Sequence, residues 1–454
     1  MASAGQNCIP FIVSTTLDKP DSKTRKLIRS HVMRGKNTRK SRQNRESLRN
    51  LESEDDDELA CVLATPRMIA SELSLFSYGV ELKPYMLDLI YRAFTVVKPS
   101  TYTLQAITAS GARDDLFRFS NLAQDPGMLH SMLFVAQAFY DLSLGTSYGR
   151  VATFHMTRAI VYLQQRINNR KEATKLTTMA VVTSLAIAAI MTGDIEAAQK
   201  HMDGLYLMFE LRGGVGSLAE GNMIVHKAQM IDLGLAMGTG STPRFIQGEV
   251  SWSPQIARGS TTTRFPELGT IHSQLDPKLL NIWADIREFS RAANKADETG
   301  VKMSKSLVSQ FSTSIPYRLL HLQFDPLSLP ELLRLCMLAY VKNLLVKIRS
   351  VGRKMASLAN KLEVALRAQQ FFPETSCEMA ELLLWSTFVA AISIFDNFDA
   401  GWLQVLMVQT ISTLGLGTWT EVRGVVKRFL WIDMIFDQPG MQVFEWISRG
   451  SLTP

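Results

Sequence analysis

The 454-residue sequence has little cysteine, glycine and proline. Its four cysteines stand far apart, at positions 8, 61, 336 and 377, so neither a disulfide framework nor a Cys-x-x-Cys zinc motif can be drawn. The 27 glycines and 16 prolines are fewer than the roughly 12% found in an average protein, which favours helices over a loop-rich β architecture. We therefore expect an all-α protein of a reducing compartment.

Signals for export and for membrane insertion are also missing. The N-terminus lacks the basic and then apolar run of a secretory signal. Only the run from Leu176 to Met191 could be considered as a membrane span, but it is shorter than the about 20 apolar residues required and contains several threonines. We predict a buried core helix there and no membrane partner.

No known catalytic or metal-binding motif stands in the chain. His155, His201 and His226 are isolated on predicted helices, and we expect packed or capping side chains there. Asp433 and Asp437 are one helical turn apart, which fits an exposed helix end. The sequence thus predicts no enzyme, no cofactor and no metal site.

What the sequence does contain is a concentrated positive charge near its N-terminus. Between Lys23 and Arg49 there are eleven basic residues and one acid, Glu46, so this window carries +10 against +7 for the whole chain. The remaining residues are therefore net negative. Directly behind the window, residues 52–58 (ESEDDDE) contain six acids in seven positions, and such adjoining charge blocks are typical of a solvated, disordered arm.

Three interpretations of the basic arm stay open. Clustered Lys and Arg can form a nuclear-import signal and can neutralise DNA phosphates without reading sequence. A membrane-surface patch would require a sustained apolar face, which the arm lacks. The arm can also be a disordered solubilising segment. The residues predicted to contact nucleic acid or an import receptor are Arg25, Lys26, Arg29, Arg34, Lys36, Arg39, Lys40, Arg42 and Arg45.

The rest of the chain has the three-to-four-residue apolar spacing of amphipathic and buried helices. We divide the chain into an N-terminal segment (1–22), the basic arm (23–51), an acidic linker (52–64) and a large domain of packed antiparallel helices (65–450). The earlier helices of that domain begin at Pro66, Pro84, Met128, Tyr148, Leu176 and Asp194. Asp194 is a natural N-cap, and Gly213-Gly214 is a natural C-terminal stop.

Two regions of the helical domain are distinctive in composition. Gly, Pro, Ser and Thr make up about half of residues 234–270, so we expect an irregular excursion there, disordered by default. Five tryptophans in the C-terminal half are expected to pack in the core, and an aromatic-lined ligand cavity between helices is an alternative. They are Trp385, Trp402, Trp419, Trp431 and Trp446.

Several stretches together resemble the regulatory domain of fungal-specific transcription factors. HMDGLYLMFELRGGVGSL (His201–Leu218) is similar to the family's His-x-x-Gly-Leu and Arg-Gly-Gly element, and FHMTRAIVYLQQRI (Phe154–Ile167) resembles the preceding helix. LLLWSTFVAAISIF (Leu382–Phe395) and VRGVVKRFLWIDMIFDQPG (Val422–Gly440) resemble its C-terminal pair. The N-terminal residues 11–42 also resemble an opening segment found in a subset of these proteins.

The resemblance implies a helical regulatory domain, a nuclear location and a role in transcription. The partners that it implies are DNA-binding transcription factors or an import receptor, and it is compatible with an oligomer. In most members this domain follows a binuclear zinc cluster held by six cysteines, whereas this chain has four scattered ones. Sequence-specific DNA reading is therefore not carried over, and a cluster upstream of Met1 stays an open alternative. The competing functions are an interaction module or corepressor without DNA contact and, more distantly, a helical small-molecule enzyme.

Overall fold

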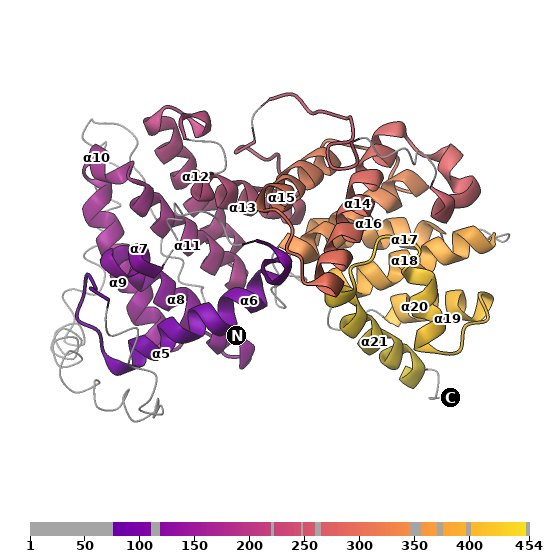
Figure 1. The fold of residues 1–454 in the computed structure, drawn as a ribbon, viewed down its shortest axis with the longest axis horizontal. Helices are drawn as coiled ribbons and strands as arrows, with labels where there is room; N and C mark the ends of the chain where they lie inside the picture. The colour runs from indigo at the N-terminus through magenta and orange to yellow at the C-terminus, as the bar shows by residue number, and fades with distance from the viewer. Residues whose placement is uncertain are drawn as a thin grey trace, which may run out of the picture. The chain divides into compact units, whose positions relative to one another are not determined.

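A computed structural model describes residues 76–109, 119–218, 222–246, 248–258, 265–345, 356–369, 376–395 and 401–450. Over these ranges the chain forms helices and no β-strand, apart from an isolated bridge between Thr108 and Met303 (Figure 1). The predicted all-α fold is confirmed. The segment 1–22, the basic arm, the acidic linker and most of the helix expected from Pro66 lie outside the described ranges, and residues 76–83 are not helical.

The first group of helices includes those predicted from Pro84, Met128, Tyr148, Leu176 and Asp194. In chain order they are α5 (Pro84–Arg92), the π-helical η1 (Ala93–Val97), α6 (Lys98–Thr101), η2 (Thr103–Ile107), α7 (Phe119–Gln124), α8 (Pro126–Ser143), α9 (Arg150–Ile167), α10 (Arg170–Ala173), α11 (Leu176–Thr192), α12 (Ile195–Arg212), η3 (Val215–Ser217) and α13 (Met223–Thr239). Consecutive helices joined by short links pack against each other, as α8 does with α9 and α11 with α12.

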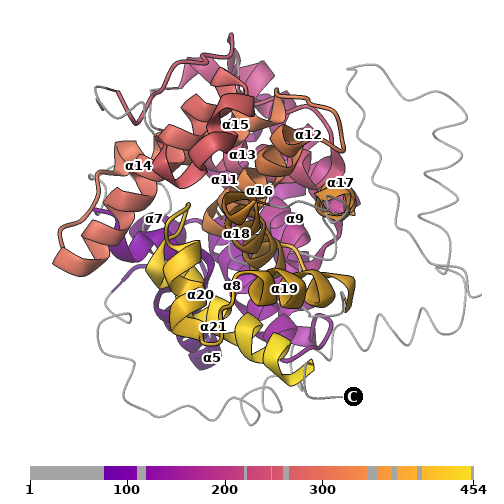
Figure 2. The same ribbon diagram turned by 90° about the vertical axis from the view of Figure 1, so that its right-hand side faces the viewer.

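The second group surrounds two central helices. Its members are η4 (Pro266–Gln274), α14 (Pro277–Thr299), α15 (Lys305–Leu320), α16 (Leu329–Leu345), α17 (Ala356–Ala368), α18 (Cys377–Ser393), α19 (Gly401–Thr413), α20 (Trp419–Val426) and α21 (Asp433–Gly450). Helices α16 and α18 contact each other and lie among α15, α17, α19 and α20 (Figure 2). The five tryptophans pack in or against this core, as predicted.

Helix α11 is the buried core helix that its composition predicts. Eleven of its side chains are buried, and it packs against α8, α12 and α13. Its buried threonines have hydrogen-bonded hydroxyls: Thr183 donates to the carbonyl of Met179 within the helix at 2.8 Å, and Thr178 donates to the carbonyl of Glu172 in α10 at 2.8 Å. Within the described residues, no helix is long and apolar enough to cross a membrane.

The ends of α12 agree with the expectations from the sequence. The Asp194 carboxylate accepts a hydrogen bond from the Ala197 amide at 3.0 Å, which pairs an amide that the helix itself leaves unsatisfied. Gly213 closes the helix with φ +105°, a left-handed conformation that costs glycine nothing and other residues strain. The side chain of Asp194 therefore caps the N-terminus of α12, and the left-handed backbone of Gly213 ends the helix.

Helix α13 is shared by two hydrophobic clusters. Ile224, Ala228 and Leu235 belong to the cluster formed with α8, α9, α11 and α12. Met237 belongs to the cluster formed by the later helices, and Met230 packs against it. Opposite sides of α13 therefore contribute to different cores.

The irregular excursion is shorter than predicted, because α13 continues through Gly234 and Gly238 to Thr239. Glycine inside a helix is unfavourable by about 1 kcal/mol, a cost that burial of the neighbouring Leu233 and Leu235 offsets. Gly240, with φ +78°, ends the helix. A disordered segment was expected beyond it, but the backbone amides of Arg244, Phe245 and residues 255–257 donate to buried aspartates of α13 and α14.

Candidate functional site

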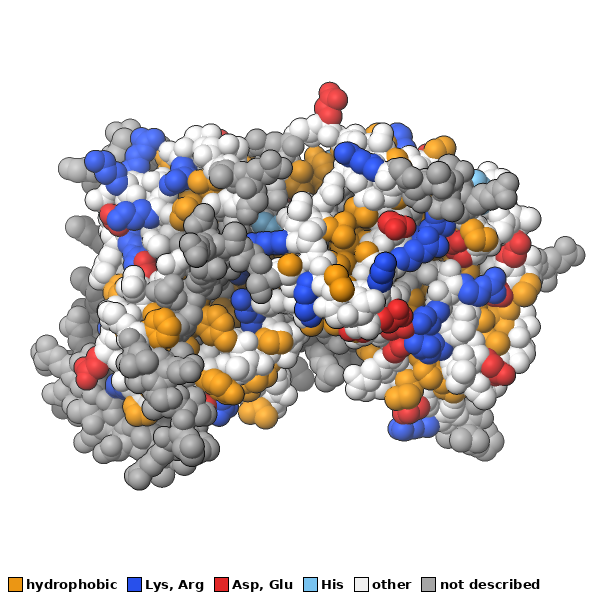
Figure 3. All heavy atoms as spheres, viewed as in Figure 1, with side chains coloured by type: hydrophobic (Ala, Val, Ile, Leu, Met, Phe, Trp, Pro, Cys, Tyr) orange, Lys and Arg blue, Asp and Glu red, His pale blue; other side chains and the backbone are white. Residues whose placement is uncertain are grey.

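The predicted nucleic-acid and import residues lie outside the described part of the chain. They are Arg25, Lys26, Arg29, Arg34, Lys36, Arg39, Lys40, Arg42 and Arg45. On the face of the molecule drawn in Figure 3, Lys and Arg side chains lie beside Asp and Glu side chains, and hydrophobic side chains are interspersed. The helical body thus has a mixed surface on this face, and the concentrated basic charge is a property of the N-terminal sequence.

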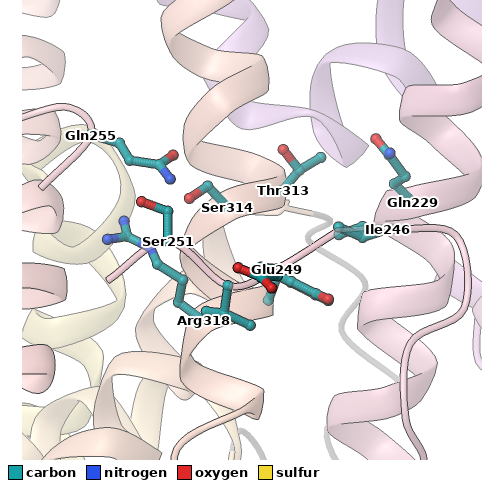
Figure 4. A pocket seen from close by; sticks show the side chains of 10 residues that line it. Gln229, Ile246, Glu249, Ser251, Gln255, Thr313, Ser314 and Arg318 are labelled. Atoms are coloured by element: carbon teal, nitrogen blue, oxygen red, sulfur yellow. The ribbon is translucent and has the colours of Figure 1, made fainter. Parts of the chain in front are cut away.

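A polar pocket lies between the segment that follows α13 and the helices α13 and α15 (Figure 4). Its volume is about 200 Å³. Ile246 and residues 249–255 contribute one wall, and α15 forms the other. The lining consists of Gln229, Ile246, Glu249, Val250, Ser251, Gln255, Thr313, Ser314, Tyr317 and Arg318. Tyr317 is the one aromatic residue among them, so this pocket differs from the aromatic-lined cavity considered from the sequence.

An almost fully buried ion pair anchors one end of this wall. The Arg318 guanidinium donates to the Asp285 carboxylate at 2.5 Å, and Asp285 is completely buried on α14. The same carboxylate accepts hydrogen bonds from the backbone amides of Gln255, Ile256 and Ala257 at 2.7 to 3.0 Å. A charge removed from water is expensive unless it is paired and hydrogen-bonded, and these four donors meet that requirement.

A second aspartate holds the other end of the wall. The Asp232 carboxylate on α13 accepts hydrogen bonds from the amides of Arg244 and Phe245 at 2.5 and 2.9 Å. Burial raises the pKa of Asp232, and the two backbone hydrogen bonds partly oppose that rise. Phe245 is itself fully buried against Phe209 and Tyr206. The segment is therefore fixed at both sides of the pocket.

The lining retains unused hydrogen-bonding capacity. Ser314 Oγ and Arg318 Nε are buried and have no hydrogen-bond partner within the described residues. Other lining groups make only long contacts: Gln229 donates to the Phe245 carbonyl at 3.3 Å, and the Tyr317 hydroxyl donates to the Gly248 carbonyl at 3.5 Å. Since buried polar groups are normally paired, the arrangement can accept further donors and acceptors from a bound molecule.

Residues 109–429 match the family described as the fungal specific transcription factor domain. The chain belongs to this family. No curated protein and no solved structure matches the chain. The resemblance identified in the sequence is confirmed over these residues, whereas the resemblance of residues 11–42 stays a prediction.

The Arg-Gly-Gly element of the fungal specific transcription factor domain ties α12 to the neighbouring helix pair. Arg212 donates to the Thr174 carbonyl, between α10 and α11, at 2.8 Å. Gly213 and Gly214 turn the chain with positive φ, and the Gly214 amide donates to the Phe209 carbonyl at 2.8 Å. This element has a structural role.

Residues Phe429, Leu430 and Trp431, within the resembling stretch Val422–Gly440, lie between α20 and α21 and are held by polar contacts. Trp385 donates to the Leu430 carbonyl at 2.8 Å, and Trp431 donates to the Asp437 carboxylate at 2.8 Å. Arg423 pairs with both Asp433 and Asp437 at 3.0 and 2.7 Å, and these contacts raise its pKa against the opposing effect of desolvation. Asp433 and Asp437 therefore pair with α20, whereas an exposed helix end was expected from the sequence.

A buried histidine pair lies between α8 and α9 of the domain. His130 and His155 face each other with 2.8 Å between their Nδ1 atoms. Desolvation, together with the charge of Arg158, lowers the pKa of His130 to about 4, and desolvation, together with the charge of His130, lowers the pKa of His155 to about 3. His155 is fully buried, so it is a packed histidine, as predicted. Its partner His130 was not identified from the sequence.

His201 and His226 are the other two histidines singled out in the sequence. Desolvation lowers the pKa of both, that of His226 to about 4. The His226 Nδ1 atom lies 3.1 Å from the Ser309 hydroxyl, within hydrogen-bond distance. The contact of His226 and the desolvation of both side chains agree with the packed or capping role predicted for the two residues.

The described part of the domain contains no group of three or more His, Cys, Asp or Glu side chains that could hold a metal ion. Cys336 is buried, Cys377 is exposed, and neither forms a disulfide. Burial raises the pKa of the Cys336 thiol to about 12, which keeps it protonated at neutral pH. Cys8 and Cys61 lie outside the described residues.

The residues that build the pocket were not identified from the sequence. Asp285 lies on α14 between Ile282 and Phe289, on the same buried stripe as these apolar residues. A carboxylate within an apolar stripe is a signal that could have predicted a buried partner. The identity of that partner, Arg318, depends on how α14 and α15 pack.

Proposed function

We propose that this protein regulates transcription in the nucleus, acting through its helical domain and contacting DNA backbone through its basic arm. The match of residues 109–429 to the fungal specific transcription factor domain is the observation that carries this proposal. It favours a regulator over an enzyme. The arm, at residues 23–51, adds the electrostatic means of reaching DNA and an import receptor.

Contact by the arm is expected to be nonspecific. Lysine and arginine neutralise phosphates and release counterions, so the logarithm of the affinity falls with the logarithm of salt concentration by about 0.9 for each phosphate contacted. Phosphate contacts orient a protein on DNA but do not read bases. We therefore expect similar affinities for unrelated duplexes at equal salt.

The DNA contact is tested by titrating the purified full chain with unrelated duplexes at several salt concentrations. Neutralising Arg39, Lys40 and Arg42 to glutamine should weaken binding and flatten the salt slope by about 0.9 for each phosphate that is no longer neutralised. A control with the exposed helix residues Lys295 and Lys361 changed to glutamine should bind like the wild type. Absence of binding at low salt would refute the DNA contact.

Nuclear import is tested separately with fluorescent fusions of the full chain. Removing residues 22–50 should abolish nuclear enrichment, and the Lys295 and Lys361 control should retain it. An equal distribution with and without the arm would contradict the import role. This measurement does not depend on DNA affinity, so the two functions of the arm can fail independently.

The second candidate is an interaction module or corepressor that relies on a partner for DNA reading. This candidate is favoured because a binuclear zinc cluster requires six cysteine thiolates, whereas this chain has four scattered cysteines. Recovery of a DNA-binding partner with the full chain, combined with no intrinsic affinity for DNA at low salt, would support it over the first candidate.

A further inference from the structure

We infer that the pocket between α13, α15, Ile246 and residues 249–255 binds a small, uncharged molecule with several hydroxyl groups, of about monosaccharide size. The inference goes beyond the proposed regulatory function and does not require DNA contact. It rests on the fixed walls of the pocket, the chemistry of its lining and its unused polar atoms.

The walls are fixed before any ligand arrives. Asp232 holds the amides of Arg244 and Phe245, while Asp285 holds those of residues 255–257 and the Arg318 guanidinium. Because both anchors are made by buried or largely buried carboxylates, the intervening wall is tied to α13, α14 and α15. A pocket whose walls are already in position loses less conformational entropy on binding.

The net charge of the lining argues against strongly charged ligands. Arg318 is neutralised by Asp285, so the remaining charge is the carboxylate of Glu249, which has no hydrogen-bond or ion-pair partner within the described residues. An anion would be repelled by Glu249. A cation could pair with Glu249 but would leave the Arg318 Nε donor unsatisfied.

Hydroxyl groups match the lining because each hydroxyl donates and accepts. Arg318 Nε and the amide of Gln229 supply donors, and Glu249 supplies an acceptor. The hydroxyl of Ser314, buried and unpaired within the described residues, can do either. Figure 4 shows that these groups come from the segment and from both helices, so a ligand in the pocket meets polar groups on more than one side.

The size of the pocket sets the size of the ligand. Pockets for drug-sized ligands have volumes of roughly 300 to 1,000 Å³, and this one is about 200 Å³. One sugar ring or a six-carbon polyol suits such a volume, whereas an oligosaccharide or a nucleotide does not. Exposed Glu249 and Ser251 stand on the solvent side of the lining, which leaves a route for entry.

The test is calorimetric titration of the purified full chain with D-glucose, sorbitol and myo-inositol, and with putrescine and citrate as charged probes. At least one of the three polyols should bind with a Kd of about 1 mM or below. Ser314→Met, which fills the pocket, should weaken that binding by about tenfold or more. Ser306→Met, at an exposed position on the same helix, should leave it unchanged.

A second variant keeps the test valid if Ser314→Met does not fold. Glu249 is exposed, so Glu249→Gln should fold normally and weaken the same polyol several-fold, whereas Glu298→Gln, exposed on α14, should not. The inference is overturned if no polyol binds, if only putrescine or citrate binds, or if binding is insensitive to both pocket variants. These outcomes leave the DNA and import tests unaffected.

Discussion

Arg318 and Asp285 form an ion pair of 2.5 Å in which both side chains are almost fully buried. Asp285 is also bonded to three successive backbone amides, so one carboxylate joins α14, α15 and the segment after α13. Its removal would leave the Arg318 charge buried and unpaired and would free the three amides. The pair therefore determines the geometry of the pocket wall.

Asp285→Asn is expected to destabilise the protein by about 3 to 5 kcal/mol, because a buried charge is left without its partner. The measurement is chemical denaturation followed by circular dichroism. Glu196→Gln disrupts the exposed pair of Glu196 with Lys200 and should cost less than about 1 kcal/mol. Equal effects of the two variants would show that the buried pair contributes no more than a surface one.

Acidification should destabilise the protein through the pair of His130 and His155. Their pKa values are lowered from 6.5 to about 4 and about 3. The unfolded state therefore takes up protons first: stability is complete above pH 6.5 and falls as the pH drops towards 4, by about 1.4 kcal/mol per pH unit for each histidine.

His155→Gln should reduce this dependence on pH, and the check is the free energy of unfolding measured at pH 7, 6 and 5. His321→Gln, at an exposed position, should leave the dependence unchanged. A wild-type protein with constant stability between pH 7 and pH 5 would contradict the buried, neutral state of the pair.

Gly440→Ala should destabilise α21. A Cβ atom there would lie 2.6 Å from Trp419 Cη2 and 3.3 Å from Trp431 Cη2, so the packed rings would have to shift at a cost of about 1 to 3 kcal/mol. Gly204→Ala, inside α12 with nothing within 4 Å of the added atom, should instead stabilise by about 0.5 to 1 kcal/mol. Melting temperatures that shift in opposite directions would bear this out, and a common direction would contradict it.

Asp194→Ala should cost about 1 kcal/mol through loss of the N-cap of α12. Asp194→Asn keeps an oxygen that can accept from the Ala197 amide and should recover most of that loss. Denaturation midpoints of both variants provide the measurement. If the asparagine variant is as unstable as the alanine variant, the capping bond is not the source of the effect.

Helix type and position could be predicted because local signals determine them. The Asp194 cap, the Gly213 stop and the apolar run of α11 all act within a few residues of the chain. Helix α13 was not predicted, because Gly234 and Gly238 are typical of loops. Only the tertiary packing of Leu233 and Leu235 explains why the helix continues past these glycines.

The pocket could not be predicted because its parts meet through long-range contacts. Asp285 bonds to amides about 30 positions earlier and to Arg318, 33 positions later. Neither contact follows from the spacing of apolar residues. The basic arm is the opposite case: its charge is evident from the sequence alone, and its contacts stay a prediction.

Helix α13 gives the domain a source of cooperativity. Because Ile224 and Leu235 pack in one core while Met237 packs in the other, unwinding this helix removes buried apolar surface from both cores at once. Partial unfolding confined to one core would leave a helix with one side exposed to water. The described helices are therefore expected to lose their structure in a single transition rather than one half at a time.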